Sequence, residues 1–186
     1  MNNLYDELRI NECAAALLDH WLDLRAPGTV CPYKKDFMPM KLGQFLPDVF
    51  LAEWIDEDNI IIRVAGTRTS DVTRRDTTGN NLLDNSIPEN KRILREFYRK
   101  MRSGHLAGLS KHRISRAVRP TNALCMQLPL LDANGQVNFF VGVIKASPLE
   151  TSELSFEANN ENSTSNITVW HTNLNVHQAP TEIKIG

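Results

Sequence analysis

The sequence lacks the features of a membrane, secreted or metal-binding protein. None of its apolar runs is long enough to cross a bilayer, and its first residues have neither the basic nor the apolar part of a secretion signal. The three cysteines, Cys13, Cys31 and Cys125, are odd in number and lack the paired spacing of a disulfide framework or a zinc site. We therefore expect a cytoplasmic protein that makes no membrane contact.

Strong net charge is also absent. The 186 residues carry a formal net charge of −1, so nothing draws the whole molecule toward nucleic acid or anionic lipid. With 41% hydrophobic and 23% charged residues, the chain has the composition of one globular domain with tails. Any electrostatic function must therefore be local.

Common catalytic motifs are missing as well. The sequence contains no Gly-x-Ser-x-Gly, no phosphate-binding Gly-x-x-x-x-Gly-Lys loop and no His-Glu-x-x-His. Between His105 and Asp132 it has no Asp or Glu that could act as an acid or base. These absences favour a binding protein over an enzyme.

The pattern of apolar residues predicts alternating helices and strands. A stripe ending near Trp21 and Leu22 predicts an N-terminal helix, and a second stripe that begins after Pro88 and ends before Gly104 predicts a longer one. Helices are expected over 3–24, 40–45, 67–75, 80–84 and 88–103, and strands over 49–55, 59–64, 105–117, 121–131 and 136–145. The turn 132–135 joins the last two strands into a hairpin.

The last strands are apolar on both alternating sides, so both faces of the sheet should be covered. We expect helices on one face and the N-terminal helix on the other. The stripe of that helix could instead contact the same helix of a second subunit and form a homodimer. We divide the chain into an N-terminal helix with its connector over residues 1–36 and a main domain over 37–146. Residues 147–186 are polar and are predicted to be a disordered tail. Near its end, residues 167–176 alternate like a short strand, which could be an edge addition, a partner-binding peptide or nothing, and we expect nothing stable in isolation.

Particular residues add a resemblance to this order of elements. Trp21 near the end of the first helix precedes a connector containing Pro32 and Asp36 and ending at Pro39, and Leu46-Pro47 follow. Further on come Arg63-Val64-Ala65-Gly66-Thr67 and Asp76-Thr77-Thr78-Gly79. Together they resemble the compact bacterial PAS proteins of the PAS_5 family. Arg75 and Lys34-Lys35 depart from the usual glycine and arginine, and the tail lies outside the resemblance.

The resemblance implies an α+β fold with a PAS-like five-stranded antiparallel sheet, helices on one face and the N-terminal helix packed against it. It also implies a sensory or interaction domain in bacterial signalling. The run Asn-Cys-Arg-Phe of flavin-binding relatives is absent from 78–83, and the helix 88–103 lacks the histidine that haem-binding relatives offer. Neither flavin nor haem is therefore expected as a cofactor.

Arg63 interrupts an apolar strand, and a charge near a core is costly unless it is paired. Its predicted partner is Asp76 or Asp71, in a bridge that fixes the short helices to the sheet. The alternative is that Arg63 meets a small anionic ligand in the pocket. Arg63 and Asp76 are therefore pocket candidates.

His112 and Cys125 are the other pocket candidates. Histidine is a common metal ligand, but His105 and His112 are seven positions apart on one predicted strand and would point to opposite faces, so no metal site is predicted. Cys125 is either a redox sensor or, as is usual for a buried strand cysteine, an inert core residue.

Residues 91–119 hold ten basic residues against one acid, Glu96. Arg92, Arg95, Arg99, Arg113 and Arg116 are the candidates for a basic patch. Such a patch would bind a nucleotide, nucleic acid or an acidic partner. The alternative is a solvated surface with no ligand, since the stacking aromatics of a single-strand binder are missing.

The sequence thus predicts a non-catalytic PAS-type sensory or protein-interaction domain that relays a ligand or partner signal through contact with another signalling protein. No kinase, phosphodiesterase, cyclase or helix-turn-helix sequence is present, so the output should pass through another polypeptide. The alternatives are a small cone-shaped α+β isomerase or hydratase, and nucleotide or nucleic-acid binding through 91–119.

Overall fold

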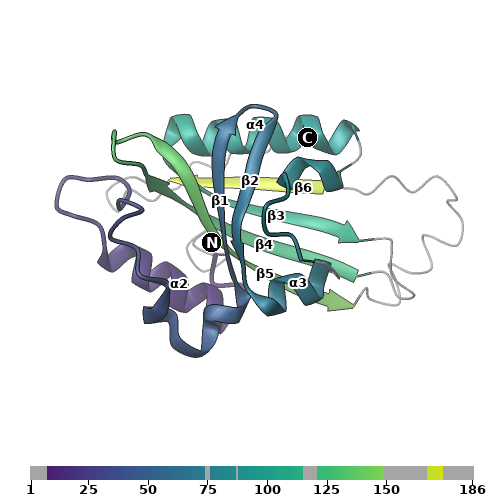
Figure 1. Cartoon of the computed structure of the whole chain (residues 1–186), viewed down its shortest axis with the longest axis horizontal. Helices are drawn as coiled ribbons and strands as arrows, with labels where there is room; N and C mark the ends of the chain where they lie inside the picture. Colours follow the sequence, from purple (N-terminus) through teal and green to yellow (C-terminus); the bar gives the residue numbers. More distant parts are fainter. Residues whose placement is uncertain (1–7, 74–75, 87, 115–120, 149–166, 174–186) are drawn as a thin grey trace, which may run out of the picture.

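A computed structural model describes residues 8–73, 76–86, 88–114, 121–148 and 167–173 (Figure 1). The described residues form one antiparallel sheet in the order β2-β1-β5-β4-β3-β6. The strands are β1 (Val49–Asp56), β2 (Asn59–Ala65), β3 (Leu106–Ile114), β4 (Thr121–Leu131), β5 (Val137–Pro148) and β6 (Ile167–Asn173). The α+β class and the antiparallel sheet are as predicted, with a sixth strand in addition.

The helical elements also follow the sequence prediction closely. The described helices and 3₁₀ turns are α2 (Glu12–Asp23), η1 (Pro39–Asp48), α3 (Thr67–Thr73), η2 (Leu82–Asn85) and α4 (Pro88–Gly104). Within η1 the backbone is kinked at Gly43, whose φ of 53° few other residues adopt. No helix in these ranges combines the length and the apolar character needed to span a membrane.

Helix α4 covers one face of the sheet, here called the inner face. The Tyr98 ring packs on Phe140 of β5 at 5.0 Å between centroids, and the Arg102 guanidinium lies 5.7 Å from the centre of the Trp54 ring on β1. Figure 1 shows α4 running alongside β6 at one edge of the strongly twisted sheet. The strand residues that share this face alternate with those of the outer face.

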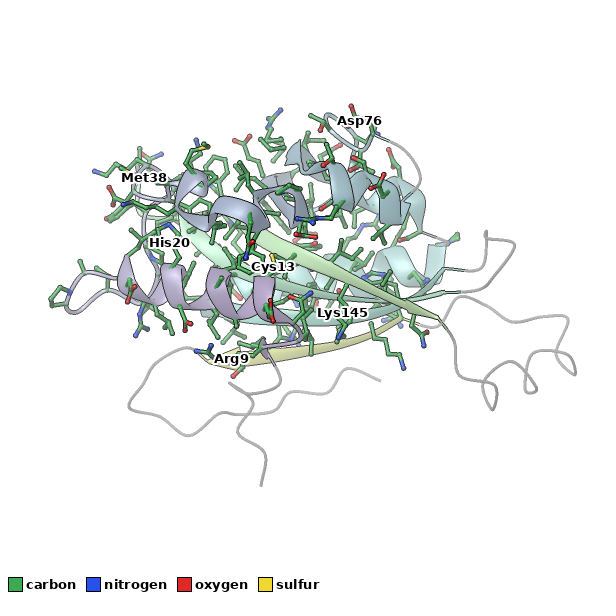
Figure 2. All side chains as sticks on the ribbon, turned by 90° about the horizontal axis from the view of Figure 1, so that it is seen from below. Arg9, Cys13, His20, Met38, Asp76 and Lys145 are labelled. Atoms are coloured by element: carbon green, nitrogen blue, oxygen red, sulfur yellow. The ribbon has the colours of Figure 1, made fainter. Side chains whose placement is uncertain are left out.

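Helix α2 covers the outer face, so the prediction that both faces are covered is confirmed. Its side chains Leu17, Leu18 and Trp21 are each 0% exposed, and the helix contacts β4 and β5. Lys145 of β5 extends toward the beginning of α2, where its Nζ donates to the carbonyl oxygen of Ile10 at 3.1 Å (Figure 2). The apolar stripe of α2 is therefore buried within its own chain.

The first turn of α2 explains where the helix begins. The side chain of Asn11 accepts a hydrogen bond from the backbone N–H of Ala14 at 2.7 Å, which satisfies one of the free donors of the helix. Helix α2 therefore begins at Glu12, within the range predicted for the N-terminal helix, and residues 1–7 lie outside the described part.

The far end of α2 is fixed to the sheet by one buried hydrogen bond. Trp21 Nε1 donates to the carbonyl oxygen of Pro129 at 2.7 Å. Pairing between β3 and β4 ends at Gly108 and Gln127, so none of the described strands competes for this oxygen. In a strand the N–H and the carbonyl of one residue point to the same side. The N–H that Pro129 lacks would therefore face the same unpaired side as its carbonyl, and the sheet loses no hydrogen bond by having proline here.

Gly66 brings two segments of the chain into direct contact. A Cβ atom at this position would lie 2.2 Å from the carbonyl oxygen of Pro47, which is far inside contact distance. The Gly66 N–H also donates to the carbonyl oxygen of Val49 at 2.9 Å. The Leu46-Pro47 turn thus packs on backbone, and this position requires glycine.

The segment 76–81 closes the outer edge of β2. The Gly79 N–H donates to the carbonyl oxygen of Ile62 at 2.7 Å, and the Ile62 N–H donates to that of Asn80 at 3.0 Å. Asn81 adds a side-chain bond, because its Oδ1 accepts from the Ile60 N–H at 3.2 Å. An edge strand covered in this way offers few free groups for pairing with another chain.

Two parts of the predicted tail belong to the sheet, and near its end the structure shows the alternative of an edge addition. Strand β5 continues to Pro148, and Ile167–Asn173 pairs with β3 as β6. A seven-residue strand has little stability alone, but here β3 supplies its hydrogen bonds and α4 buries one side of it. Residues 149–166 and 174–186 lie outside the described part, and the division at residue 36 stays a prediction.

Candidate functional site

The space between α4 and the inner face is densely filled. A Cβ atom on Gly108 would lie 2.3 Å from Phe97 Cζ and 2.6 Å from Met101 Sδ, so α4 sits directly on the backbone of β3. Phe97, Met101 and Phe140 are each 0% exposed. Polar groups in this region must therefore find their partners within the protein.

Tyr98 of α4 and Gln127 of β4 form a buried pair. The Tyr98 hydroxyl donates to Gln127 Oε1, and the two residues are 1% and 2% exposed. Burial raises the pKa of Tyr98 well above its ordinary value of 10, so the hydroxyl keeps its proton and remains a donor. This bond links the long helix to the centre of the sheet.

Ser110, His112 and Cys125 continue this polar line along the inner face. Ser110 Oγ lies 2.9 Å from His112 Nε2, and Ser110 is paired with Cys125 across the β3–β4 ladder. Burial lowers the pKa of His112 to about 4 and raises that of Cys125 to about 12, the latter offset in part by hydrogen bonds to Gln127 and Ser110. We call Tyr98, Ser110, His112, Cys125 and Gln127 the inner polar row.

The inner polar row is neutral near pH 7, which limits its chemistry. Its members can donate and accept hydrogen bonds, but none supplies a charge, a thiolate or a proton acceptor matched to neutral pH. Cys13 and Cys31 are buried too, and burial raises the pKa of each to about 12. Among the described residues no three His, Cys, Asp or Glu side chains gather to hold a metal ion.

Two of the four predicted pocket residues, His112 and Cys125, lie in the inner polar row. Tyr98 lies on the apolar stripe of the helix that was predicted over 88–103, and neither Ser110 nor Gln127 was among the predicted site residues. Gln127 carried a usable signal, because it is the polar residue within the apolar run of β4. Ser110 gave none, since serine is common on exposed strands.

Arg63 was predicted either to pair with Asp76 or Asp71 or to meet an anionic ligand in the pocket, and the predicted pairing was wrong. Leu51 pairs with Val64 and Ala52 with Ile62, so Arg63 is the extra residue of a β-bulge. Its Nε donates instead to Glu53 Oε2 on β1 at 2.5 Å, and 47% of its side chain is exposed. A carboxylate partner exists, but on the outer face of the sheet.

Asp76 has a local role in the turn that covers β2. Its Oδ1 accepts from the Thr78 N–H at 2.9 Å, an arrangement that stabilises the turn before Gly79. Figure 2 shows Asp76 at the periphery of the molecule, far from Cys13 and α2. The side chain is exposed and does not reach the inner polar row.

The predicted basic patch is largely paired on α4. Lys91 contacts Asp84 at 3.5 Å, Arg95 pairs with Asp58, and Arg99 and Lys100 both contact Glu96, at 2.5 Å and 3.6 Å. The remaining candidate whose side chain is described, Arg92, is exposed.

The sequence run 91–119 is also divided in space. Lys111 of β3 alternates with Ser110 and His112, so its side chain lies on the face opposite α4. The backbone of Arg113 belongs to β3, and Arg116 lies outside the described residues. The described basic residues therefore do not form one continuous surface.

His105 differs from the prediction as well. It lies in the turn between α4 and β3 with φ of 53°, a left-handed conformation that only a few side chains adopt readily. His105 and His112 therefore do not share a strand, and the alternation of side chains along one strand does not describe this pair.

Comparison with known proteins supports the fold described above. The family model PAS_5, described as a PAS domain, matches residues 10–145, which is most of the chain and runs from the beginning of α2 into β5. A search of curated proteins finds no match. The sheet, its helices and this match agree, and the chain belongs to the PAS_5 family of PAS domains.

Proposed function

We propose that this PAS domain is a non-catalytic sensory module of bacterial signalling that acts in the cytoplasm and relays a signal by contact with another signalling protein. Membership of the PAS family supports a sensory or interaction role in general. The specific part of the proposal, the relay of a signal to α4, depends on the inner polar row. A change at Gln127 reaches α4 directly through its hydrogen bond with Tyr98, and the other side of α4 is partly exposed.

The chemistry of the row indicates what would act on it. Its groups are neutral hydrogen-bonding partners, so a ligand that enters there is a neutral polar molecule. Arg63, the group proposed to meet an anion, lies on the outer face beside Glu53. An anionic ligand at Arg63 is therefore not part of the proposal.

The N-terminal helix is not proposed as a dimer contact. Its apolar stripe is already buried against β4 and β5 of the same chain. Pairing two copies through that stripe would require α2 to leave the sheet and would break the bond from Trp21 to Pro129.

The two alternatives have less support. An isomerase or hydratase would use an interior carboxylate with a raised pKa. Among the described residues the carboxylates whose pKa is clearly shifted are Asp56, Glu96 and Asp132, and the pKa of each is lowered. Nucleic-acid binding would use free basic groups, and those of α4 are mostly paired with acids.

Native mass spectrometry of the freshly purified full chain, with an absorbance spectrum, tests the proposal. We expect either a neutral small molecule that is lost in Gln127→Leu and retained in the control Arg63→Met, or an empty domain that forms a defined complex with a signalling protein. A bound anion that depends on Arg63, or turnover of a bound compound, would contradict the proposal.

A further inference from the structure

Strand β6 occupies the edge of the sheet beside β3. Seven residue pairs join the two strands, from Leu106 opposite Asn173 to His112 opposite Ile167. Among the described strands β6 pairs with β3 alone. It also begins 22 positions beyond residue 145, where the family match ends. The last strand is thus an addition to the matched PAS fold.

Two side chains of β6 fit the inner face beside α4. Val169 is 1% exposed and lies opposite Ser110, while His171 is 1% exposed and lies opposite Gly108. The residues facing them on β3 are small, which leaves room under α4 for larger side chains from the neighbouring strand. The site therefore selects for the side chains of the strand that it pairs with, as well as for its backbone.

His171 makes the most specific contact. Its ring packs on Phe97 at 4.9 Å between centroids, and its Nε2 lies 2.9 Å from the Phe97 carbonyl oxygen. A carbonyl can only accept, so Nε2 carries the proton and donates. The Phe97 carbonyl of α4 thereby favours a side chain with a hydrogen-bond donor at this position of β6.

The fit of β6 is nevertheless incomplete. His171 Nδ1 and Thr172 Oγ1 are buried, and neither has a hydrogen-bond partner within the described part of the chain. Burial of each such group carries a desolvation cost that no hydrogen bond offsets. A strand of the same pattern without these two atoms would bind the edge at least as well as β6 does.

The chain between β5 and β6 is long enough for β6 to separate from the sheet. From Pro148 to Ile167 the chain has to pass only β4 and β3, three strand spacings or about 15 Å. The 18 residues of 149–166, four of them Glu and none basic, can span about 60 Å when extended. Departure of β6 would therefore put no strain on the rest of the chain.

We propose that the β3 edge is a strand-addition site that β6 fills within its own chain until an extended segment of a signalling partner displaces it. The partner segment carries a β-branched residue opposite Ser110 and a hydrogen-bond donor opposite Gly108 that reaches the Phe97 carbonyl. Main-chain pairing supplies affinity and the two side chains supply specificity. This inference rests on the proposed function and names the surface of its protein contact.

Hydrogen exchange of the unmodified full chain gives the first test. We expect the amides of β6 to exchange at least about tenfold faster than those of β4 and β5, because β6 opens locally without global unfolding. If β6 amides are protected as long as those of β4 and β5, the strand is a permanent part of the fold and the proposal fails.

A cleavable full chain gives the second test. A protease site is inserted between Asn160 and Glu161, the chain is cut, and a fluorescent peptide of residues 165–175 is added. We expect the peptide to replace β6 in the cut chain and to bind the uncut chain about 100-fold more weakly, since the tethered strand competes at roughly millimolar effective concentration. The matched control is the same peptide with Val169→Asp, which should bind at least about tenfold more weakly.

Three results would overturn the proposal: no exchange of the peptide, equal binding of the control peptide, or equal binding to cut and uncut chains. A dimer of the uncut chain that Val169→Asp abolishes would also overturn it, because a second copy would then supply the strand. A small molecule lost in Gln127→Leu would leave the proposed sensory function standing after any of these results.

Discussion

Gly66 shows how strongly one position depends on the absence of a side chain. The Pro47 carbonyl occupies the place of a Cβ atom, and both segments are backbone with little freedom to shift. We expect Gly66→Ala to lower the free energy of unfolding by about 1–3 kcal/mol or more, as overpacking does. Urea denaturation measures the change.

Gly104→Ala is the matched control for this substitution. The atoms nearest a Cβ there belong to the Leu106 side chain, which is partly exposed and can rotate. A loss of stability as large as that of Gly66→Ala would show that added volume, and not the contact with Pro47, is responsible.

Arg63 marks the limit of prediction for a single residue. The sequence shows a charge within a run of apolar residues, and such a run does not reveal which of its sides faces the core. In β2 the side chains of Ile60 and Ile62 are buried, so alternation places Arg63 on the other face, where Glu53 lies. The choice of face depends on how β1 and β2 pair and pack, which the local sequence does not specify.

At the scale of elements, the hydroxyl of Tyr98 connects α4 to β4. Tyr98→Phe should cost about 1–3 kcal/mol of unfolding free energy, because it leaves the buried Gln127 oxygen without its donor. Gln127→Leu should cost a similar amount. Denaturation of both single variants and the double variant tests this coupling.

The double variant should cost less than the sum of the single ones, because it leaves no unsatisfied partner. Additive costs would mean that the hydroxyl and the amide act independently and that α4 does not sense the row through this bond.

The indole of Trp21 connects α2 to the opposite face. Trp21→Phe keeps an aromatic ring but removes the donor to the Pro129 carbonyl, so we expect a loss of about 1–3 kcal/mol. Proteolysis kinetics should then show earlier cleavage within α2. Unchanged stability would imply that packing of the ring alone holds the helix.

The order of elements could be predicted from the sequence because each strand and helix carries its own periodic pattern and turn residues. β1, β2 and the β4–β5 hairpin end within a few residues of the predicted positions. The segment of β6 also alternates like a strand, but its place in the sheet could not be predicted in this way, since its stability comes from β3 and α4, which are distant in sequence. The polar row was found only in part for the same reason.

For the whole molecule, the histidines of β3 and β6 predict how stability depends on pH. Burial lowers the pKa of His112 from 6.5 to about 4, and it lowers that of His171 in the same direction. The unfolded chain therefore binds protons that the folded chain does not, and stability falls as pH drops from about 6.5 toward 4. His112 alone should contribute about 2 kcal/mol between pH 7.5 and pH 5.

Urea denaturation at these two pH values checks this prediction. His112→Gln keeps a hydrogen-bonding side chain beside Ser110 but cannot be protonated, so its stability should depend less on pH than that of the unmodified protein. An unchanged dependence would assign the effect to other groups.

The buried thiols can report the order in which parts of the protein unfold. Cys13 lies in α2, Cys31 in the connector and Cys125 in β4, and each is protonated and shielded while its surroundings remain folded. Alkylating reagents react with an accessible thiolate, so each cysteine is labelled only after the part of the protein around it has opened. Peptide mapping of the labels over time would therefore give the order in which the N-terminal layer, the connector and the sheet separate.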